Sequence, residues 1–371
     1  MQSKQNQTHL KSNMLCIKKL LVRGAINSIT PPINEYIETS KRSLLSKKGL
    51  MKLGWRSLRR LAPLVISNQK KHLLTTIDPQ KHKKCLWLYY DAPQIGDALM
   101  DLAPRSLLYK LGIEIDLFTH AHIAQLFADD KFIHSVQSDP KLIQPEKYDF
   151  VIITNFTWKA LKHKIIYTRH QPWISIYGEF TGPEINRALF STKRLAELTK
   201  QKLSAKDQDL HAQQKLTFTT DTKKTPSPSK SVALAIGGVD KDRTFTNWDA
   251  LIKELENIGI QDVILLGSTN GLTEANAIKS VSLKIHNFVG KTSLIECRNL
   301  MQKTTLIIAA DGGLMHLATT TETPVIGLFN NTINPIWRLP KHLLKYAVQS
   351  QSRSVEDIEI SNIINMAKKL I

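Results

Sequence analysis

Cysteine is scarce in this sequence, and the cysteines that occur are isolated from one another. Only three are found in 371 residues, at Cys16, Cys85 and Cys297, and no two of them form a CxxC pair. A disulfide-stapled fold and a cysteine zinc cluster are therefore both excluded as the organising feature. Isolated thiols are typical of a reducing compartment.

Long apolar runs are also missing. No stretch approaches the roughly 18–20 apolar residues that a membrane-spanning helix needs. The first residues lack the apolar core and cleavage site of a secretory signal, so we expect none, whereas a transit peptide stays open because residues 1–34 contain no acid. Glycine (16) and proline (15) are too few for a collagen-like or low-complexity chain.

Positive charge is abundant but unevenly distributed. The chain has 51 Lys+Arg and 32 Asp+Glu, a formal net charge of +19. Residues 1–84 hold 18 basic and 3 acidic residues and so carry +15, whereas the remaining 287 residues carry only +4. A near-neutral body with a basic N-terminal extension disfavours a nucleic-acid groove across the protein, so we expect no nucleic-acid partner.

One segment of the extension, residues 47–65, has the pattern of an amphipathic helix that Pro63 ends or kinks near its last turn. A basic amphipathic helix is typical of a membrane-surface element. The alternative is a helix that packs its apolar face on its own protein, and the pattern does not choose between them. The apolar face consists of Met51, Trp55, Leu58, Ala62 and Val65, widened by Leu50, Leu53, Leu61 and Leu64, and the basic face of Lys48, Lys52, Arg56, Arg59 and Arg60.

From residue 85 onward, short apolar segments alternate with helical patterns. Helices between strands predict right-handed βαβ units, and therefore parallel sheets. One expected helix covers 97–112, with Gly112 at its C-terminal end. The expected strands are 85–91, 113–120, 132–137, 148–156 and 172–178 in the first half, and 232–238, 262–268, 285–290, 305–311 and 324–329 in the second.

The length exceeds what one hydrophobic core supports, which predicts more than one domain. Residues 205–230 are polar and turn-rich, and form the best interdomain linker. We therefore predict an α/β protein of two Rossmann-like doubly wound domains, 85–204 and 231–371, facing a cleft, after a basic extension over 1–84. Ligands of such sheets bind outside the carboxyl ends of the strands.

The sharpest candidate site follows the expected strand 305–311, where Asp311 leads into GGLMHLA. Gly312 and Gly313 let a phosphate approach the free amides at the start of the next helix, whose dipole favours negative charge. His316 adds a donor to the same anion, while Asp311 accepts from hydroxyls of a sugar or ribose. The alternative, which spacing alone favours, is an ordinary strand–turn–helix corner with a core histidine.

A second candidate lies in the loop after the first strand, where Gly96 and Asp97 fall close to a helix start. Asp97 has the chemistry of a general base that activates a hydroxyl. An aspartate at such a position is, however, most often an N-cap. Asp91 and Asp101 are less well placed, and we expect Asp101 to be a solvated helix residue.

A third candidate is the loop GGVDKDRTFTNW, in which Lys241 and Arg243 stand between a strand and a helix. Cations at this position can neutralise a diphosphate leaving group. For either residue alone, the simpler interpretation is a charged loop side chain that is solvated by water. No GxGxxG follows a leading strand and no GxxxxGK[ST] occurs, so a nicotinamide oxidoreductase and a P-loop ATPase lose their main support.

Together these segments resemble glycosyltransferase family 9, the heptosyltransferases of lipopolysaccharide core assembly. Residues 309–340, AADGGLMHLATTTETPVIGLFNNTINPIWRLP, are similar to the family's D-[ST]-G-x-x-H-L-A block and the TPV block that follows it. Residues 290–301 and 94–104 resemble two further family elements, and the four blocks agree in order and spacing. The resemblance covers residues 85–371 and leaves the extension out.

This resemblance implies a GT-B fold whose C-terminal domain binds a nucleotide-sugar donor, by default ADP-heptose, as a substrate and without a cofactor. It implies that the donor-binding cation is Lys241 or Arg243, and loop length does not distinguish them. No metal is implied, because a helix N-terminus and cations stabilise the leaving diphosphate. The resemblance assigns catalysis to Asp97 and donor binding to the block of Asp311, Gly312, Gly313, Leu314 and His316.

Three departures from the family pattern leave the donor's identity open. Gly312 replaces the usual Ser/Thr, AIGG at 235–238 replaces a His-Pro-Gly turn, and Asn330 and Asn331 replace a Gly-Pro. We expect an inverting glycosyltransferase that acts on a lipopolysaccharide core or other lipid-linked acceptor, cytoplasmic and peripheral on the inner membrane face through residues 47–65. The alternative is a nucleotide-binding, membrane-associated family member without transferase activity.

Overall fold

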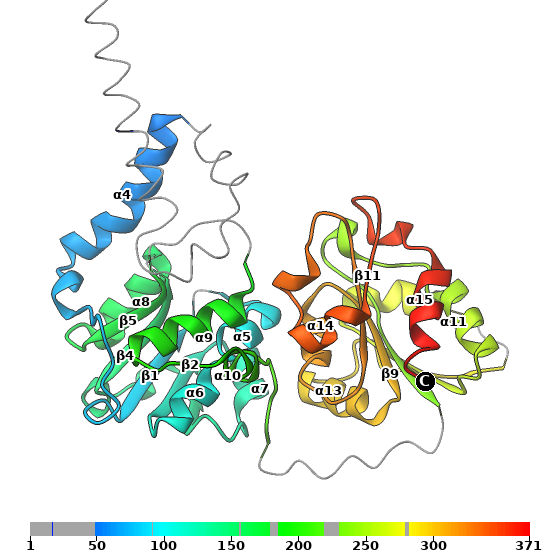
Figure 1. Cartoon of the computed structure of the whole chain (residues 1–371), viewed down its shortest axis with the longest axis horizontal. Helices are drawn as coiled ribbons and strands as arrows, with labels where there is room; N and C mark the ends of the chain where they lie inside the picture. The colour runs from blue at the N-terminus through cyan, green and yellow to red at the C-terminus, as the bar shows by residue number, and fades with distance from the viewer. Residues whose placement is uncertain are drawn as a thin grey trace, which may run out of the picture. The chain divides into compact units, whose positions relative to one another are not determined.

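The computed structural model describes Ile17 and residues 49–90, 92–155, 157–178, 185–218, 230–278 and 282–371. These residues form two compact units, each built on one parallel sheet (Figure 1). The first unit comprises residues up to 93 together with 104–124 and 132–211, and the second comprises 94–103, 125–131 and 212–371. Cys16 and Asp91 lie outside the described residues, as do residues 219–229 of the expected linker.

The first sheet has five parallel strands in the order β3-β2-β1-β4-β5. This is the doubly wound order, in which the chain runs outward from β1 on one side and then returns to continue from β4 on the other. The strands are β1 (Lys84–Tyr89), β2 (Glu114–Thr119), β3 (Ser135–Gln137), β4 (Phe150–Asn155) and β5 (Trp173–Gly178). The helices along this part of the chain are α5 (Ile95–Asp101), α6 (Arg105–Lys110), α7 (Ala121–Phe127), α8 (Trp158–Thr168), α9 (Arg187–Leu198) and α10 (Ala205–His211).

The second sheet repeats this plan with six parallel strands in the order β11-β10-β9-β6-β7-β8. Its strands are β6 (Ser231–Ala235), β7 (Asp262–Leu266), β8 (Lys284–Asn287), β9 (Leu306–Ala310), β10 (Val325–Phe329) and β11 (Ala347–Gln349). Its helices are α11 (Trp248–Asn257), α12 (Leu272–Ala277), α13 (Leu294–Lys303), α14 (Gly313–Ala318) and α15 (Ile360–Ala367). The prediction of two doubly wound α/β domains is confirmed.

Continuous burial explains why these segments become central strands. Helices cover both faces of a parallel sheet, so its inner strands read as unbroken apolar runs. All of β6 and β10 and the first four residues of β9 are buried, and their side chains join α11 and α15 in one core. Every strand expected from such a run is present, whereas β11 was not expected because it is short and only partly buried.

The helix expected over 97–112 is two helices, α5 and α6, separated by a turn at 102–104. Pro104 explains the break, because proline has no N–H to donate and disfavours helical backbone in the residue before it. Gly112 follows α6 with a φ of +71°, the left-handed conformation expected at a helix end. The expectation that Asp101 is solvated was wrong: it is 1% exposed.

The expected amphipathic helix is α4 (Leu50–Ile66), with Pro63 inside its last turn. Its apolar row faces outward: Met51 is 89% exposed, Trp55 63% and Val65 68%, and Leu58 is also exposed. Leu64, which widens the same predicted apolar face, is instead buried in a core with β1, β4, β5 and α8, and this contact holds α4 on the first unit. No helix among the described residues is long and apolar enough to span a membrane.

Candidate functional site

The main candidate site lies at the point of the second sheet where the strand order reverses. There β6 and β9 are neighbours, but β6 continues to β7 on one side and β9 to β10 on the other. Ligands of open parallel sheets bind at this switch point, beyond the carboxyl ends of the strands. The loop after β6 carries Lys241 and Arg243, and Asp311 follows β9 directly.

Asp311 is a buried carboxylate held by two arginines. Its side chain is 2% exposed, and its Oδ2 lies 3.2 Å from Nη1 of Arg243 and 3.6 Å from Nε of Arg338. A buried carboxylate needs such partners, because leaving it unpaired in a low-dielectric setting is costly. Arg243 also pairs with Asp240, whose Oδ2 lies 3.5 Å from its Nε, so the two arginines of this corner face two carboxylates.

The two cations that the sequence left open differ in their contacts. Both belong to the single turn η4 (Lys241–Arg243), but Arg243 turns toward Asp311 whereas Lys241 is exposed. Two glycines fix the start of this loop: Gly237 has a φ of +86°, and a Cβ on Gly238 would lie 2.2 Å from Oγ1 of Thr244. The glycines of AIGG, which stand where the family has a His-Pro-Gly turn, thus allow tight packing around the turn that carries Lys241 and Arg243.

His316 is buried in the first turns of α14, beside the same carboxylate. Its Nε2 lies 4.0 Å from Oδ1 of Asp311, and its Nδ1 lies 2.9 Å from Oε1 of Gln214. Its ring also touches α5, because a Cβ on Gly96 would lie 2.5 Å from its Cδ2. The histidine is therefore held on both sides, by Gln214 and by α5.

Gly312 and Gly313 leave the start of α14 open. Gly312 is extended, with φ 177° and ψ −175°, a conformation that any residue adopts. A Cβ at Gly312 would meet nothing closer than the Ala310 carbonyl oxygen at 3.8 Å, and one at Gly313 nothing closer than Ile95 at 3.9 Å. The amides at the start of α14, including that of the half-buried Leu314, thus lie in a place with room for a ligand.

Asp97 lies in the first turn of α5, one residue after the contact between Gly96 and His316. The N-cap of α5 is Gln94, so the alternative that Asp97 caps this helix is wrong. Because α5 packs on α14 within the second unit, the predicted base and the predicted donor block belong to one compact body.

Two residues of this site were missed by sequence reasoning. Arg338 stood inside the family-like block 309–340 but had no assigned partner, and only the fold brings it to Asp311. Gln214 stood in the expected linker 205–230, where nothing marked it. That segment also contains α10, which belongs to the first unit.

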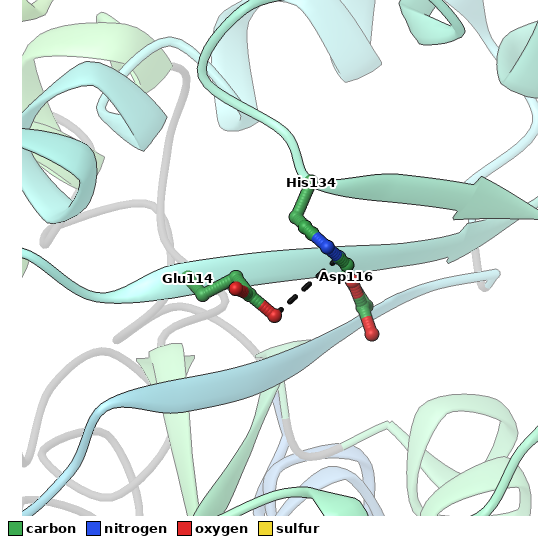
Figure 2. A group of neighbouring side chains, drawn as sticks. All are labelled: Glu114, Asp116 and His134. Carbon is green, nitrogen blue, oxygen red and sulfur yellow. Dashed lines mark hydrogen bonds and ion pairs between the residues drawn. The ribbon is translucent and has the colours of Figure 1, made fainter.

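A separate acidic group lies in the first unit, where Glu114, Asp116 and His134 bring ligand atoms within 4.8 Å of one another (Figure 2). These residue types can hold a metal ion, but Lys84 pairs with Glu114 and lies 3.3 Å from Asp116. Burial opposes ionisation of Asp116, yet hydrogen bonds from Ser135, His134 and Tyr148 hold its pKa below the ordinary value. The group sits at the beginnings of β1 and β2, the edge opposite to their carboxyl ends.

The protein has two doubly wound parallel sheets. The second sheet has cations and the N-terminus of a helix at its switch point. This architecture defines a GT-B type α/β protein. Residues 183–363, just under half of the chain, match the family model of glycosyltransferase family 9 (heptosyltransferase). The family assignment made from the motifs is thereby confirmed for this part of the chain, which contains Arg243, Asp311 and His316.

Solved structures extend the likeness over most of the chain. The chain is 17% identical to Escherichia coli ADP-heptose lps heptosyltransferase II, with a TM-score of 0.57 over 77% of this chain and 98% of that one. It is 12% identical to a family 9 glycosyltransferase from Veillonella parvula, with a TM-score of 0.62 over 80% and 99%. It is 13% identical to E. coli heptosyltransferase WaaC with ADP, with a TM-score of 0.61 over 78% and 100%. These likenesses show the fold. None of the curated protein sequences compared with the chain matches it.

Proposed function

We propose that this protein is an inverting glycosyltransferase that moves a heptose, or a related sugar, from an ADP-linked donor to a lipid-linked saccharide such as a lipopolysaccharide core. The observation that carries the proposal is the packing of α5 on α14, which brings Asp97 into one body with the Arg243–Asp311–His316 group. Two of the similar structures are described as an ADP-heptose heptosyltransferase and a heptosyltransferase with ADP, which favours this donor class.

In the proposed reaction, Asp97 takes the proton from an acceptor hydroxyl while that oxygen attacks the anomeric carbon of the donor. The bond between this carbon and the diphosphate oxygen breaks, its electron pair leaves with the nucleoside diphosphate, and the configuration inverts. Arg243 and the amides at the start of α14 neutralise the charge that develops on the leaving group. We propose that these groups suffice without a metal ion.

The test is the pair of variants Asp97→Ala and Asp97→Asn, compared with Asp129→Asn, which changes an exposed aspartate. Transfer is measured by mass spectrometry with ADP-, UDP- and GDP-sugars, and ADP binding by calorimetry. We expect loss of transfer with ADP affinity kept in both Asp97 variants, and normal transfer in the control. Full turnover by Asp97→Asn would overturn the assigned role.

We further propose that α4 holds the enzyme on the inner face of the cytoplasmic membrane, where a lipid-linked acceptor lies. Self-packing accounts for Leu64, at one edge of the apolar face, which packs on the first unit. Of the rest of the described face, Met51, Trp55, Leu58 and Val65 stay exposed. The surrounding segment, residues 1–84, carries +15, and basic residues near an anionic bilayer contribute about 1 kcal/mol each. Apolar insertion and charge attraction therefore act together on this helix.

Vesicle sedimentation tests this membrane proposal. The variant Met51→Ser/Trp55→Ser/Leu58→Ser should bind phosphatidylglycerol-containing vesicles at least tenfold more weakly than the native chain. Ile166→Ser, which removes an exposed apolar side chain from α8, is the matched control and should bind normally. Equal binding by the triple variant, or equal binding to neutral vesicles, would contradict the proposal.

The second candidate function is nucleotide binding without transfer. Gly312 favours it, because the usual hydroxyl at this position is missing although the backbone leaves room for one. ADP binding without turnover of any donor in the panel would favour this candidate.

A further inference from the structure

Asn330 holds the turn η4 from a neighbouring loop of the second unit. It directly follows β10 and is 3% exposed. Its Nδ2 lies 3.2 Å from the backbone oxygen of Asp242, the residue before Arg243. The loop after β10 is thereby tied to the loop after β6, although β9 lies between these two strands in the sheet.

The hydrogen bonds of Asn330 fix which way its amide points. Its Oδ1 accepts from the backbone N–H of Thr332 at 3.0 Å and from the Thr332 hydroxyl at 2.7 Å. A backbone N–H only donates, so the amide oxygen must face Thr332 and the NH₂ group must face Asp242. The backbone oxygen of Asn330 accepts from Nε2 of Gln349 in β11 at 2.9 Å. The residue that donates to the turn is therefore itself held in place.

The contact with Asp242 bears directly on the direction of Arg243. The carbonyl of Asp242 and the N–H of Arg243 belong to one planar peptide unit. Asn330 donates to the carbonyl of this unit, and its N–H donates within the turn at 3.0 Å. The next unit is also held, because the N–H of Thr244 donates within the turn at 3.2 Å. With the peptide planes on both sides fixed, the bond from Cα to Cβ of Arg243 has a defined direction.

This direction brings Nη1 of Arg243 to 3.2 Å from Asp311 and leaves 34% of the arginine side chain exposed, so a ligand can reach it. Asn330 stands where the family usually has glycine, which has no side chain to donate. The hydrogen bond to Asp242 is therefore one that the usual family residue cannot make.

We infer that Asn330 is a positioning residue that holds Arg243 in place for the diphosphate of the donor. A long side chain that is ordered before binding lowers the entropic cost of binding the ligand. The diphosphate rests on the proposed function, whereas the hold on the turn does not.

Hydrogen exchange of the full chain tests the hold on the turn without any ligand. In Asn330→Ala, the amides of Arg243 and Thr244 should exchange about fivefold faster than in the native chain, the effect of one lost hydrogen bond. The amides of β7 and β9 should keep their rates. Asn330→Asp keeps the acceptor oxygen and loses only the donor, so it should give at least the same local increase.

Asn331→Ala is the matched control, because this neighbouring asparagine is exposed and donates to the backbone oxygen of Gln351 instead. Its turn should exchange as in the native chain. Native exchange rates at the turn in both Asn330 variants would overturn the inference, and so would faster exchange throughout the second sheet.

A double-mutant cycle tests the ligand part by calorimetry with ADP. Asn330→Ala should bind ADP about threefold to tenfold more weakly than the native chain. In the Arg243→Ala background the same change should alter binding less than twofold, because the side chain that Asn330 positions is gone. An equal loss in both backgrounds would overturn the ligand part. If the native chain binds no nucleotide, the ligand part falls with the proposed function, and the exchange result still decides the hold on the turn.

Discussion

Gly96 and His316 approach so closely that a Cβ on the glycine would lie 2.5 Å from Cδ2 of the imidazole. Real Cβ atoms do not approach other atoms to this distance, so every larger residue must displace the histidine or move α5. The absence of a side chain at position 96 therefore positions two predicted functional groups, His316 and the neighbouring Asp97.

The first prediction concerns this contact. Gly96→Ala should lower kcat/KM at least tenfold and destabilise the fold by about 1–3 kcal/mol, the range for overpacking a filled site. Gly54→Ala in α4 is the control, because a Cβ there meets nothing within 4 Å. Urea unfolding and donor turnover measure the two effects. Normal activity in Gly96→Ala would show that the α5–α14 packing does not matter to the reaction.

The second prediction separates the two candidate cations. Arg243→Ala should weaken ADP binding by about 2–3 kcal/mol, because it removes a charged contact and leaves the buried Asp311 with one arginine fewer. Lys241→Ala, which changes the exposed cation of the same turn, should weaken binding less than threefold. Calorimetric titration with ADP decides between them, and the reverse order of effects would assign the role to Lys241.

The third prediction concerns Lys164, which is fully buried in α8 and donates to Oε1 of Gln69 and to the backbone oxygens of Arg169 and Gln171. Burial lowers its pKa to about 7. Between pH 7 and about 10 the unfolded chain therefore holds this proton more tightly than the folded chain. The free energy of unfolding should then rise with pH, by at most about 1.4 kcal/mol per pH unit.

Urea unfolding between pH 7 and 8.5 measures this slope. Lys164→Met should flatten it relative to the native chain, whereas Lys162→Met, which changes an exposed lysine of the same helix, should leave it unchanged. An identical slope in Lys164→Met would mean that this lysine keeps its proton throughout the range.

The fourth prediction compares two glycines. Gly312 is extended and has room for a side chain, so Gly312→Ser should change the free energy of unfolding by less than about 0.5 kcal/mol. Gly237 has a φ of +86°, and a Cβ there would lie 2.8 Å from Cα of Gly271, so Gly237→Ser should cost more than about 2 kcal/mol. Thermal unfolding of both variants checks the contrast. A comparable loss of stability in Gly312→Ser would mean that the fold does not tolerate, at position 312, the Ser/Thr that is usual in the family.

The sequence predicts those features of the structure that depend on neighbouring residues along the chain. The buried strands β6, β9 and β10 were predictable because their apolar runs follow directly from burial on both faces. Strand β11 gave no such run, and Pro104 divided a helix whose apolar pattern continued across it.

The candidate site shows the same limit. Asp311 and His316 were found because they lie within one strand–turn–helix unit. Arg338 contacts Asp311 from 27 residues away along the chain, and Gln214 contacts His316 from 102 residues away. No pattern in the sequence predicts either contact. The proposal of Arg243 rather than Lys241 likewise depends on the directions of two side chains within a single turn, which the sequence does not show.

The exposed row of α4 has a consequence for the protein in the absence of lipid. Met51, Trp55, Leu58 and Val65 then face water, and two copies of the chain can cover this surface by pairing their helices. Self-association and bilayer binding would compete for the same four side chains. The amount of free monomer would then be set by protein concentration as well as by available membrane area, and mild detergent should release the monomer from both.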